Sequence, residues 1–141
     1  MRPTREETYM SMAHILSMRS TCARRAVGCI LADKHGAILG LGYNGVPSGW
    51  DHCIEVHCGG QDLPTGEGLS RCWAIHAEQN ALLRCKDPTA IDMAVVTTMP
   101  CIHCQKLLLN TPCKTIYYSL PYVGPKVWNR KLVCLGVTDE D

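Results

Sequence analysis

Three residues of the kinds that bind Zn²⁺ lie on two separate segments of this chain, so the fold has to bring those segments together. The first segment is His76-Ala77-Glu78, and the second is Pro100-Cys101-Ile102-His103-Cys104. One imidazole and two thiolates leave the fourth position of a tetrahedral zinc ion open, which separates a catalytic site from a closed structural one. The sequence therefore predicts a catalytic zinc held by His76, Cys101 and Cys104.

Glu78 lies two residues after the predicted ligand His76 and supplies a carboxylate that the metal does not need. Zn²⁺ lowers the pKa of a coordinated water to about 7, so hydroxide is available near neutral pH. A carboxylate beside that water can take up and deliver its protons. We therefore expect Glu78 to act as the catalytic proton carrier without binding the ion.

The spacing of the two cysteines fits the start of a helix. If Cys101 begins a helix, Cys104 lies one turn further along the same face, and both sulfurs can reach one ion. Pro100 suits the first turn, and the positive end of the helix favours thiolate over thiol. A lone C-x-x-C also occurs in redox motifs and in structural zinc knuckles. The upstream His76 and Glu78 favour the catalytic interpretation.

The length of the chain, 141 residues, fits one domain spanning residues 1–141, with a core large enough to fold without disulfides. The N-terminal residues contain no apolar signal region, and no apolar run is long enough to cross a bilayer. We therefore expect a cytoplasmic protein, in the host cytoplasm if viral, with no membrane partner. Ten cysteines in such a chain indicate metal binding and reduced thiols. Four stand in apolar surroundings that favour buried thiols: Cys29, Cys85, Cys113 and Cys134.

The charge of the chain points to a small substrate. The formal net charge is +1, from 14 basic and 13 acidic residues, whereas a polynucleotide-binding surface is usually strongly basic. We therefore expect no nucleic-acid partner. Arg19, Arg24 and Arg25 form a local basic cluster that could hold one phosphate, although arginines at a helix end are also typical of a solvated turn.

The first half of the sequence predicts a helix followed by a β-hairpin. Thr4-Arg-Glu-Glu7 has the pattern of a capping box, and the apolar spacing after it extends to about Arg19. Residues 27–33 and 37–43 flank a short turn, as the strands of a hairpin would. Residues 44–72 are rich in Gly, Pro, Asp and Cys, and we expect them to form a long loop.

The second half of the sequence alternates helices and strands. The expected elements are helices at residues 76–85 and 101–110, strands at residues 94–98 and 115–119, and a weaker helix or irregular segment at residues 127–135. This alternation after a hairpin predicts an α/β fold with a mixed sheet covered by helices on both faces. Cys101 and Ser119 are expected to follow the C-terminal ends of strands, where open α/β sheets bind their ligands.

Six segments between the first helix and Tyr122 carry a family resemblance. They are Arg19-Ser-Thr-Cys22, Val27-Gly28, Gly42-Tyr-Asn-Gly-Val-Pro47, Asp51-His-Cys53, His76-Ala-Glu-Gln-Asn-Ala81 and Pro100-Cys-Ile-His-Cys104. H-x-E followed by P-C-x-x-C is the established pattern of zinc nucleobase deaminases, and cytidine, guanine, tRNA-adenosine and riboflavin-pathway deaminases share it. With Gly-Tyr-Asn-Gly and the extra cysteines, the chain resembles the deoxycytidylate deaminases.

The resemblance implies a cytidine-deaminase-like fold, which is a three-layer α/β/α arrangement with a five-stranded mixed sheet. It also implies a zinc-dependent hydrolysis of dCMP to dUMP and ammonia, which supplies dUMP for thymidylate synthesis. Enzymes of this family are commonly hexamers that dCTP activates and dTTP inhibits. These nucleotides and further copies of the chain are therefore the expected partners.

The resemblance further implies roles for residues around the substrate. Asn44 is expected to bond the deoxyribose, since an amide both donates and accepts, although an Asn-Gly pair is also an ordinary turn. Tyr122 is expected to reach the nucleotide, with a plain surface tyrosine as the alternative. Arg24 is expected to contribute to a positive site for the phosphate, and Ala77 to line the substrate site.

The remaining cysteines predict a second, structural zinc. Cys53, Cys58 and Cys72 lie along the long loop, and Cys22 precedes the first strand. Four sulfurs would close a tetrahedral site, and metal binding would offset the chain entropy of so long a segment. Many relatives carry such a zinc with ligands that vary. His57 could replace Cys58 here, and a set of free buried thiols is the alternative.

Three other functions share parts of this pattern. A tRNA-adenosine deaminase has the same core motif, but it should offer a broader basic surface for the anticodon stem. Deamination of dCTP is a second alternative within the same chemistry. A zinc-stabilised binding module without turnover is the third, and Glu78 is evidence against it, because a structural site gains nothing from an unligated carboxylate.

Overall fold

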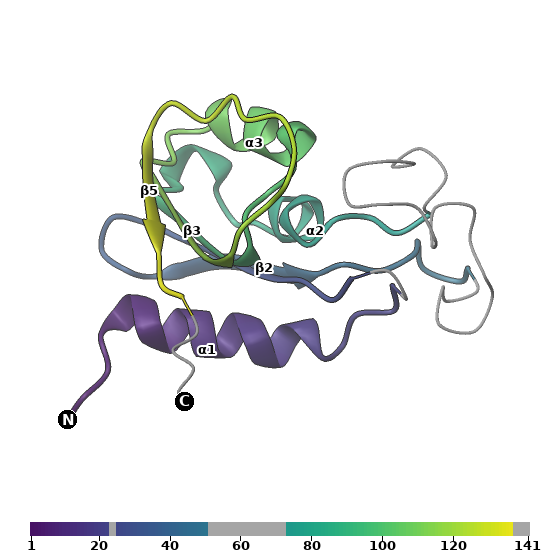
Figure 1. Cartoon of the computed structure of the whole chain (residues 1–141), viewed down its shortest axis with the longest axis horizontal. Coiled ribbons are helices and arrows are strands. Elements are labelled where there is room, and N and C mark those ends of the chain that lie inside the picture. Colours follow the sequence, from purple (N-terminus) through teal and green to yellow (C-terminus); the bar gives the residue numbers. More distant parts are fainter. Residues whose placement is uncertain (23–24, 51–72, 137–141) are drawn as a thin grey trace.

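The computed structural model describes residues 1–22, 25–50 and 73–136, and a five-stranded mixed sheet lies at its centre (Figure 1). The strands are β1 (Gly28–Ala32), β2 (Ile38–Tyr43), β3 (Met93–Thr98), β4 (Thr115–Leu120) and β5 (Lys131–Cys134), in the order β2-β1-β3-β4-β5. β1 is antiparallel to both β2 and β3, whereas β3, β4 and β5 are parallel.

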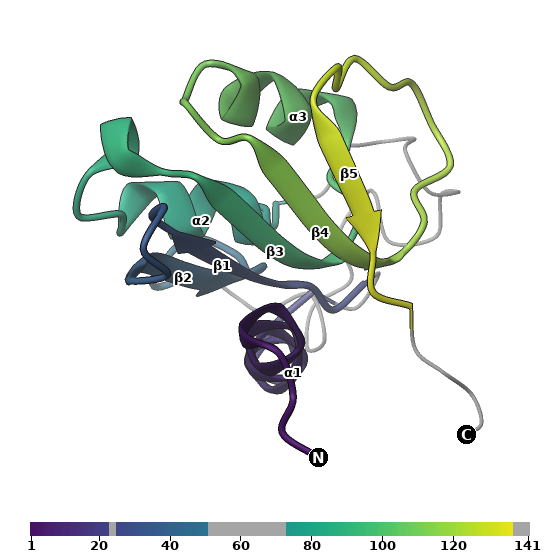
Figure 2. The ribbon, with the colours of Figure 1, turned by 90° about the vertical axis from the view of Figure 1, so that its left-hand side faces the viewer.

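Helices cover both faces of the sheet. α1 (Arg5–Ser17) lies against one face, and α2 (Ala77–Leu83) and α3 (Ile102–Leu109) lie on the other (Figure 2). A short 3₁₀ turn, η1 (Pro88–Ala90), precedes β3. The predicted three-layer α/β/α arrangement with a five-stranded mixed sheet is confirmed.

The first helix begins at the predicted capping box. The Thr4 hydroxyl accepts a hydrogen bond from the backbone N–H of Glu7 at 3.0 Å, and the Glu7 carboxylate accepts one from the Thr4 N–H at 2.8 Å. Both donors would otherwise lack a partner in the first turn. Met10 and Ala13 are the buried residues of α1. Their packing on the sheet stabilises the helix in addition to the cap.

The turn between β1 and β2 confirms the predicted hairpin. The Asp33 carboxylate accepts hydrogen bonds from the N–H groups of His35 (2.8 Å) and Ala37 (2.9 Å). Hydrogen bonding, first from Ala37, lowers the pKa of Asp33. Gly36 has a φ of 87°, a conformation that side chains rarely adopt. The turn is thus closed by one carboxylate and one glycine.

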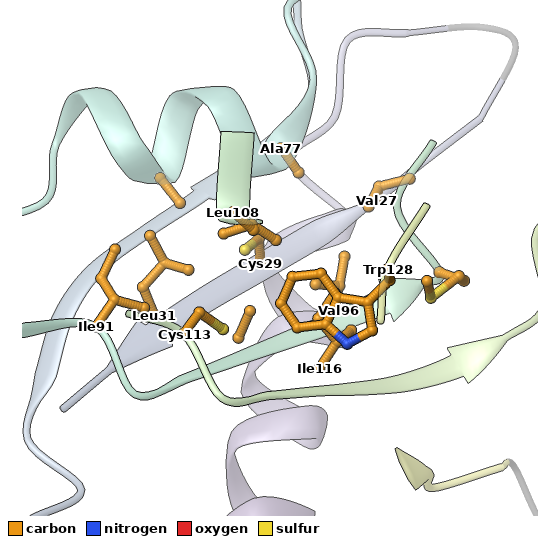
Figure 3. Packing of buried hydrophobic residues seen from close by; sticks show 13 residues of the cluster. Val27, Cys29, Leu31, Ala77, Ile91, Val96, Leu108, Cys113, Ile116 and Trp128 are labelled. Carbon is orange, nitrogen blue, oxygen red and sulfur yellow. The ribbon is translucent and has the colours of Figure 1, made fainter. Parts of the chain in front are cut away.

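The larger apolar core lies between the sheet and the helices α2 and α3 (Figure 3). Leu31, Val96 and Ile116 from three strands meet Ala77 of α2 and Leu108 of α3 there. A smaller cluster under α1 contains Met10, Ile30, Ala32, Met93 and Val95. Burial on both faces explains why β1 and β3 are buried at every position.

α2 lies unusually close to β2 because a glycine faces it. A Cβ atom built on Gly42 would lie 2.7 Å from the backbone nitrogen of Ala81 and 2.9 Å from the carbonyl oxygen of Ala77. Both atoms belong to the helix backbone, so no side chain could move aside to relieve the contact. Gly42 therefore sets the distance between the sheet and the helix that His76 precedes.

The end of the chain differs from its prediction. Residues 131–134 form strand β5 and not a helix, because they pair in parallel with residues 115–118 of β4. The preceding chain is held to α3 by Gln105, whose side-chain oxygen accepts hydrogen bonds from the N–H groups of Val127 (2.8 Å) and Trp128 (3.0 Å). Both contacts join residues far apart in the sequence, which no local periodicity reveals.

Two smaller expectations also need correction. Cys29 and Cys113 are buried as predicted, but Cys85 is only partly buried and Cys134 is exposed, since it lies on the edge strand β5. Ser119 lies inside β4 and does not follow it. No helix within the described residues is long and apolar enough to span a membrane.

Candidate metal centre and substrate pocket

His76 is placed by the chain immediately before α2. It is the N-cap residue of that helix, and its backbone N–H donates to the Gln79 side-chain oxygen at 2.9 Å. The preceding residue, Ile75, exchanges two backbone hydrogen bonds with Gly45, at 3.0 and 2.7 Å. The imidazole is therefore held between a helix start and a short antiparallel bridge.

Cys101 and Cys104 occupy the first turn of α3. Cys101 is the N-cap residue and Cys104 is a buried residue of the helix. Pro100 precedes them, and its carbonyl oxygen accepts a hydrogen bond from the Gln105 side-chain amide at 2.9 Å. Both sulfurs therefore point from one helix start, as the spacing predicts.

The three candidate ligands converge on one point. The Nδ1 atom of His76 lies 3.5 Å from the sulfur of Cys101 and 3.4 Å from that of Cys104, and all three ligand atoms lie within 4.8 Å of one another. Bonds of about 2.0–2.1 Å to nitrogen and about 2.3 Å to sulfur separate these atoms by about 3.5 Å around a tetrahedral zinc. Both cysteines are free thiols. The donor set therefore fits one Zn²⁺ and leaves one position for another ligand.

Hydrogen bonding among these groups favours a thiolate. The pKa of Cys101 is lowered to about 3, first by the hydrogen bond from the Cys104 side chain and then by that from His76. The same contact with Cys101 raises the pKa of His76. The thiolate is the form of cysteine that binds metal. The lowered pKa of Cys101 therefore favours binding of a cation at this cluster.

Glu78 lies in the first turn of α2 and is almost completely buried, with 4% of its surface exposed. Burial raises the pKa of its carboxyl group. Glu78 lines the same pocket as His76 and Cys101, but it is not part of the three-ligand cluster. A carboxyl group beside a metal site can take up and deliver protons.

The pocket in front of these groups is built from four parts of the chain. One wall is formed by Cys22, Arg25, Val27 and Asn44. The histidine and the glutamate come from the segment of Ala74, His76, Ala77 and Glu78, and the C-terminal end of β3 and the chain after it contribute Thr98, Met99 and Cys101. The C-terminal end of a strand is where open α/β sheets bind ligands. Ala77 lines the pocket as expected and is buried.

Asn44 lines the pocket, and its amide group bonds the backbone of two other residues of the same wall. Its side-chain oxygen accepts a hydrogen bond from the N–H of Val27 at 2.9 Å, and its side-chain nitrogen donates to the carbonyl oxygen of Arg25 at 2.6 Å. The side chain is 7% exposed. The expected bond to a sugar stays a prediction.

The remaining predicted site residues have different outcomes. Tyr122 packs against the larger core, and a Cβ on Gly124 would meet its ring, but Tyr122 is not among the described residues that line the pocket. Cys22 does line it. Arg24, His57 and the cysteines Cys53, Cys58 and Cys72 lie outside the described residues.

Several pocket residues were not predicted from the sequence as site residues. Arg25 is predicted only as part of a basic cluster, and Thr98 and Met99 have no predicted role, yet all three line the pocket. The signal for Thr98 and Met99 was available, because they stand at the end of a buried strand directly before Pro100. No comparable signal separated Arg25 from the neighbouring arginines.

Comparison with protein families gives one clear match. Residues 3–120 match the cytidine and deoxycytidylate deaminase zinc-binding region. The ComE operon protein 2 of Bacillus subtilis (strain 168) is 38% identical over 117 residues, which are 81% of this chain and 58% of that protein. The deoxycytidylate deaminase of Schizosaccharomyces pombe is 32% identical over 125 residues, which are 86% of this chain and 38% of that enzyme.

A solved structure of similar length gives the same result. The dCMP deaminase of the cyanophage S-TIM5 in its apo form has a TM-score of 0.72 and 31% identity, covering 96% of this chain and 100% of that chain. Its complex with dCMP and dUMP has a TM-score of 0.66 and 35% identity, covering 86% of this chain and 85% of that chain. By contrast, the chain spans less than two thirds of the curated Bacillus and yeast proteins.

Proposed function

The chain belongs to the cytidine and deoxycytidylate deaminase family, and on that premise we propose that it hydrolyses dCMP to dUMP and ammonia. The observation that carries the proposal is the convergence of His76, Cys101 and Cys104 on one point, with the buried Glu78 in the same pocket but outside that cluster. The match to a phage enzyme of similar length, whose structure contains dCMP and dUMP, supports this choice of substrate.

His76, Cys101 and Cys104 would hold the zinc ion, and Glu78 would manage the protons. When bound, Zn²⁺ acidifies a water ligand, so that a hydroxide nucleophile is available near neutral pH. As water adds to C4 of the pyrimidine, Glu78 takes up one of its protons and delivers it to the ring nitrogen N3. Glu78 then takes the proton of the new C4 hydroxyl and delivers it to the leaving amine. Ammonia departs and the C4 oxygen becomes the carbonyl of dUMP. Burial of Glu78, which raises its pKa, supports this role.

The pocket walls would orient the nucleotide. Ala77 would pack against the pyrimidine, and Asn44 would contact the deoxyribose with whichever amide hydrogen its backbone contacts leave available. Arg24 and Tyr122 would lie toward the phosphate. The narrow, partly apolar pocket fits a single pyrimidine better than a base within a folded nucleic acid.

The family also supplies proposals about the protein in its cell. The chain would act in the cytoplasm, where dUMP is needed for thymidylate synthesis, as a hexamer that dCTP activates and dTTP inhibits. A second zinc would be held by Cys22, Cys53 and Cys72 with Cys58 or His57. Cys22 lies in the described part and lines the pocket, so a metal there would order the chain beside the substrate.

A substrate panel tests the proposed reaction. Zinc-loaded protein is incubated separately with dCMP, cytidine, dCTP and a tRNA anticodon stem, and deamination is followed by ultraviolet absorbance and by released ammonia. We expect dCMP to be the preferred substrate. Preference for the tRNA stem or for dCTP, or no turnover with one zinc bound at His76, would contradict the proposal.

A further inference from the structure

Gln105 is a buried polar residue of α3 to which the proposed chemistry gives no role. It directly follows the candidate ligand Cys104, and its exposed fraction is 0%. Burying an amide without hydrogen bonds would cost about 1–3 kcal/mol. The partners of this side chain therefore show which parts of the chain it holds together.

The side chain of Gln105 uses both its donors and both its acceptor sites. Its nitrogen donates to the carbonyl oxygens of Pro100 at 2.9 Å and of Pro125 at 3.4 Å. Its oxygen accepts from the backbone N–H groups of Val127 at 2.8 Å and of Trp128 at 3.0 Å. A primary amide can make these four hydrogen bonds and no more. One side chain thus joins the turn before α3 to the segment that leads into β5.

Gln105 also fixes the backbone on both sides of Cys101. Its side-chain nitrogen holds the Pro100 carbonyl, and its backbone N–H donates to the Cys101 carbonyl oxygen at 2.9 Å. Cys101 has an extended backbone, with φ −68° and ψ 170°, and its side chain makes no cap hydrogen bond. The peptide groups before and after the Cys101 α-carbon are therefore both held by one residue. This fixes the point from which the sulfur reaches to 3.5 Å from Nδ1 of His76.

The segment at the other end of this link is itself anchored. Trp128 is 4% exposed and packs in the larger core (Figure 3), and its indole N–H donates to the carbonyl oxygen of Lys131 at 3.1 Å. Arg130 donates to three carbonyl oxygens at the opposite end of α3, at 2.8–2.9 Å. The two ends of α3 are thus held by different residues, so one end can be loosened without the other.

We propose that Gln105 is a positioning residue of the metal centre, which holds Cys101 in the orientation that binds zinc and couples this ligand to residues 125–128. Residues that orient metal ligands typically contribute about 10- to 100-fold to metal affinity or activity. The inference rests on the proposed function only in that it requires a metal at His76, Cys101 and Cys104. It requires nothing of the substrate.

The test measures metal binding by the full chain without turnover. Dissociation constants for Zn²⁺ and Co²⁺ are determined by competition with a chromophoric chelator for the wild type, Gln105→Met and Arg130→Met. The cobalt absorption bands are recorded on each protein, and bands that His76→Ala removes are assigned to this cluster. Gln105→Met keeps the side-chain length and removes four hydrogen bonds. Arg130→Met is the matched control, because it removes three hydrogen bonds from the other end of the same helix.

We expect Gln105→Met to raise the dissociation constant for zinc at the cluster roughly 10- to 100-fold. It should also shift the cobalt bands, because the direction of the Cys101 sulfur changes. Arg130→Met should match the wild type in both measurements, even where urea unfolding shows an equal loss of stability. At saturating zinc, Gln105→Met should lower kcat for dCMP more than it changes KM, since the metal is displaced and the substrate walls are not.

The coupling can also be measured in the wild-type protein. Binding effects are reciprocal, so removal of zinc with a chelator should loosen the bonds from Val127 and Trp128 to Gln105. Amide hydrogen exchange at these two residues should accelerate by up to about 10- to 100-fold. The N–H of Thr111, which is bonded to Leu108 at 3.0 Å near the other end of α3, should change less.

Three outcomes would overturn the inference. Unchanged dissociation constants and cobalt bands in a folded Gln105→Met protein would exclude a role at the metal. Equal losses of metal affinity in Gln105→Met and Arg130→Met would mean that Gln105 acts only through the stability of the helix. If Gln105→Met does not fold, exchange at Val127 and Trp128 that ignores zinc decides against the coupling. Wild-type protein that binds the metal at this cluster but does not deaminate dCMP would instead refute the proposed function alone.

Discussion

The starts of the helices use the same backbone position for different purposes. At α1 the N-cap residue is Thr4, and it exchanges hydrogen bonds with Glu7, so the first turn is closed by side chains. At α2 and α3 the N-cap residues are His76 and Cys101. Cys101 makes no side-chain cap hydrogen bond, and its sulfur faces the His76 ring instead.

The difference shows that packing, and not capping, has to stabilise the helices whose first residues serve the site. A missing N-cap costs about 0.5–2 kcal/mol, and helices of fewer than about 12 residues are marginal without tertiary contacts. α2 and α3 have 7 and 8 residues, so packing has to hold them. Gly42 lets α2 lie directly on β2, and Leu108 anchors α3 in the core. The two short helices can therefore carry metal ligands at their N-cap positions, and at α2 Gln79 still bonds the backbone N–H of the N-cap residue His76.

We expect the largest loss of activity from a substitution in the first turn of α2. Glu78→Gln keeps the size of the side chain and removes its ability to carry a proton. We expect kcat for dCMP to fall roughly 10²- to 10⁴-fold, the usual contribution of general acid–base catalysis. Zinc content should stay that of the wild type, because Glu78 lies outside the ligand cluster. Turnover and zinc per chain are measured on the same preparation.

Two results would contradict this role. Turnover by zinc-loaded Glu78→Gln close to that of the wild type would remove Glu78 from the proton transfer. Loss of the metal from this variant would instead identify Glu78 as a ligand. A matched Gln79→Glu variant would not serve as a neutral control, because Gln79 bonds the backbone of His76. Lys86→Gln, exposed and beyond the end of α2, is the better comparison.

We expect intermediate losses of stability and activity from substitution of the glycines that let the helices pack closely on the sheet. Gly42→Ala would push α2 away from β2, whereas Gly28→Ala would push α1, because a Cβ on Gly28 would meet the carbonyl oxygen of Ala13. Overpacking of this kind typically costs about 1–3 kcal/mol of folding stability. We expect both variants to be destabilised in urea unfolding, but only Gly42→Ala to lose kcat, by up to about 10²-fold, since small displacements of catalytic groups are costly.

Comparing these two variants tests whether only the face of the sheet that packs on α2 positions the catalytic groups. Activity is measured per folded, zinc-loaded molecule, so that loss of stability alone does not lower it. Equal losses of kcat in Gly42→Ala and Gly28→Ala would mean that the α1 face also positions the site. An unaltered kcat in Gly42→Ala would mean that α2 can move without displacing His76 and Glu78.

We expect the smallest change, a loss of stability without a loss of activity, from removal of the cap of α1. Thr4→Ala removes the hydroxyl that accepts from the Glu7 N–H, and it should lower the free energy of unfolding by about 0.5–2 kcal/mol. Thr4→Ser keeps the hydroxyl and should remain close to the wild type. Neither variant should change kcat, because Thr4 lies at the far end of the helix from the pocket wall. A fall in kcat with Thr4→Ala would show that the two kinds of helix start are not independent.

Most of the candidate site could be predicted because its residues lie close together within two short segments of the sequence. His76 and Glu78 lie within three residues of each other, and Cys101 and Cys104 lie within four. Local helix geometry decides where such neighbours point, so the sequence predicts both halves of the ligand set. The capping box at Thr4 was predictable for the same reason.

What could not be predicted depends on long-range contacts. β5 exists because Ile116 pairs with Leu132, and Gln105 reaches across to hold the chain that leads into it. Neither contact leaves a local pattern in a segment of four residues. Arg25 likewise enters the pocket because Asn44, 19 residues away, bonds its carbonyl oxygen. The sequence shows only several arginines close together.

A zinc-edge anomalous difference map from crystals of the zinc-loaded protein tests most directly whether two helix starts hold one catalytic ion. We expect a peak bonded to Nδ1 of His76 and to the sulfurs of Cys101 and Cys104, with the Glu78 carboxylate outside the coordination shell. A Cys101–Cys104 disulfide, a peak that Glu78 coordinates, or no peak at this cluster while zinc is bound elsewhere would contradict the account.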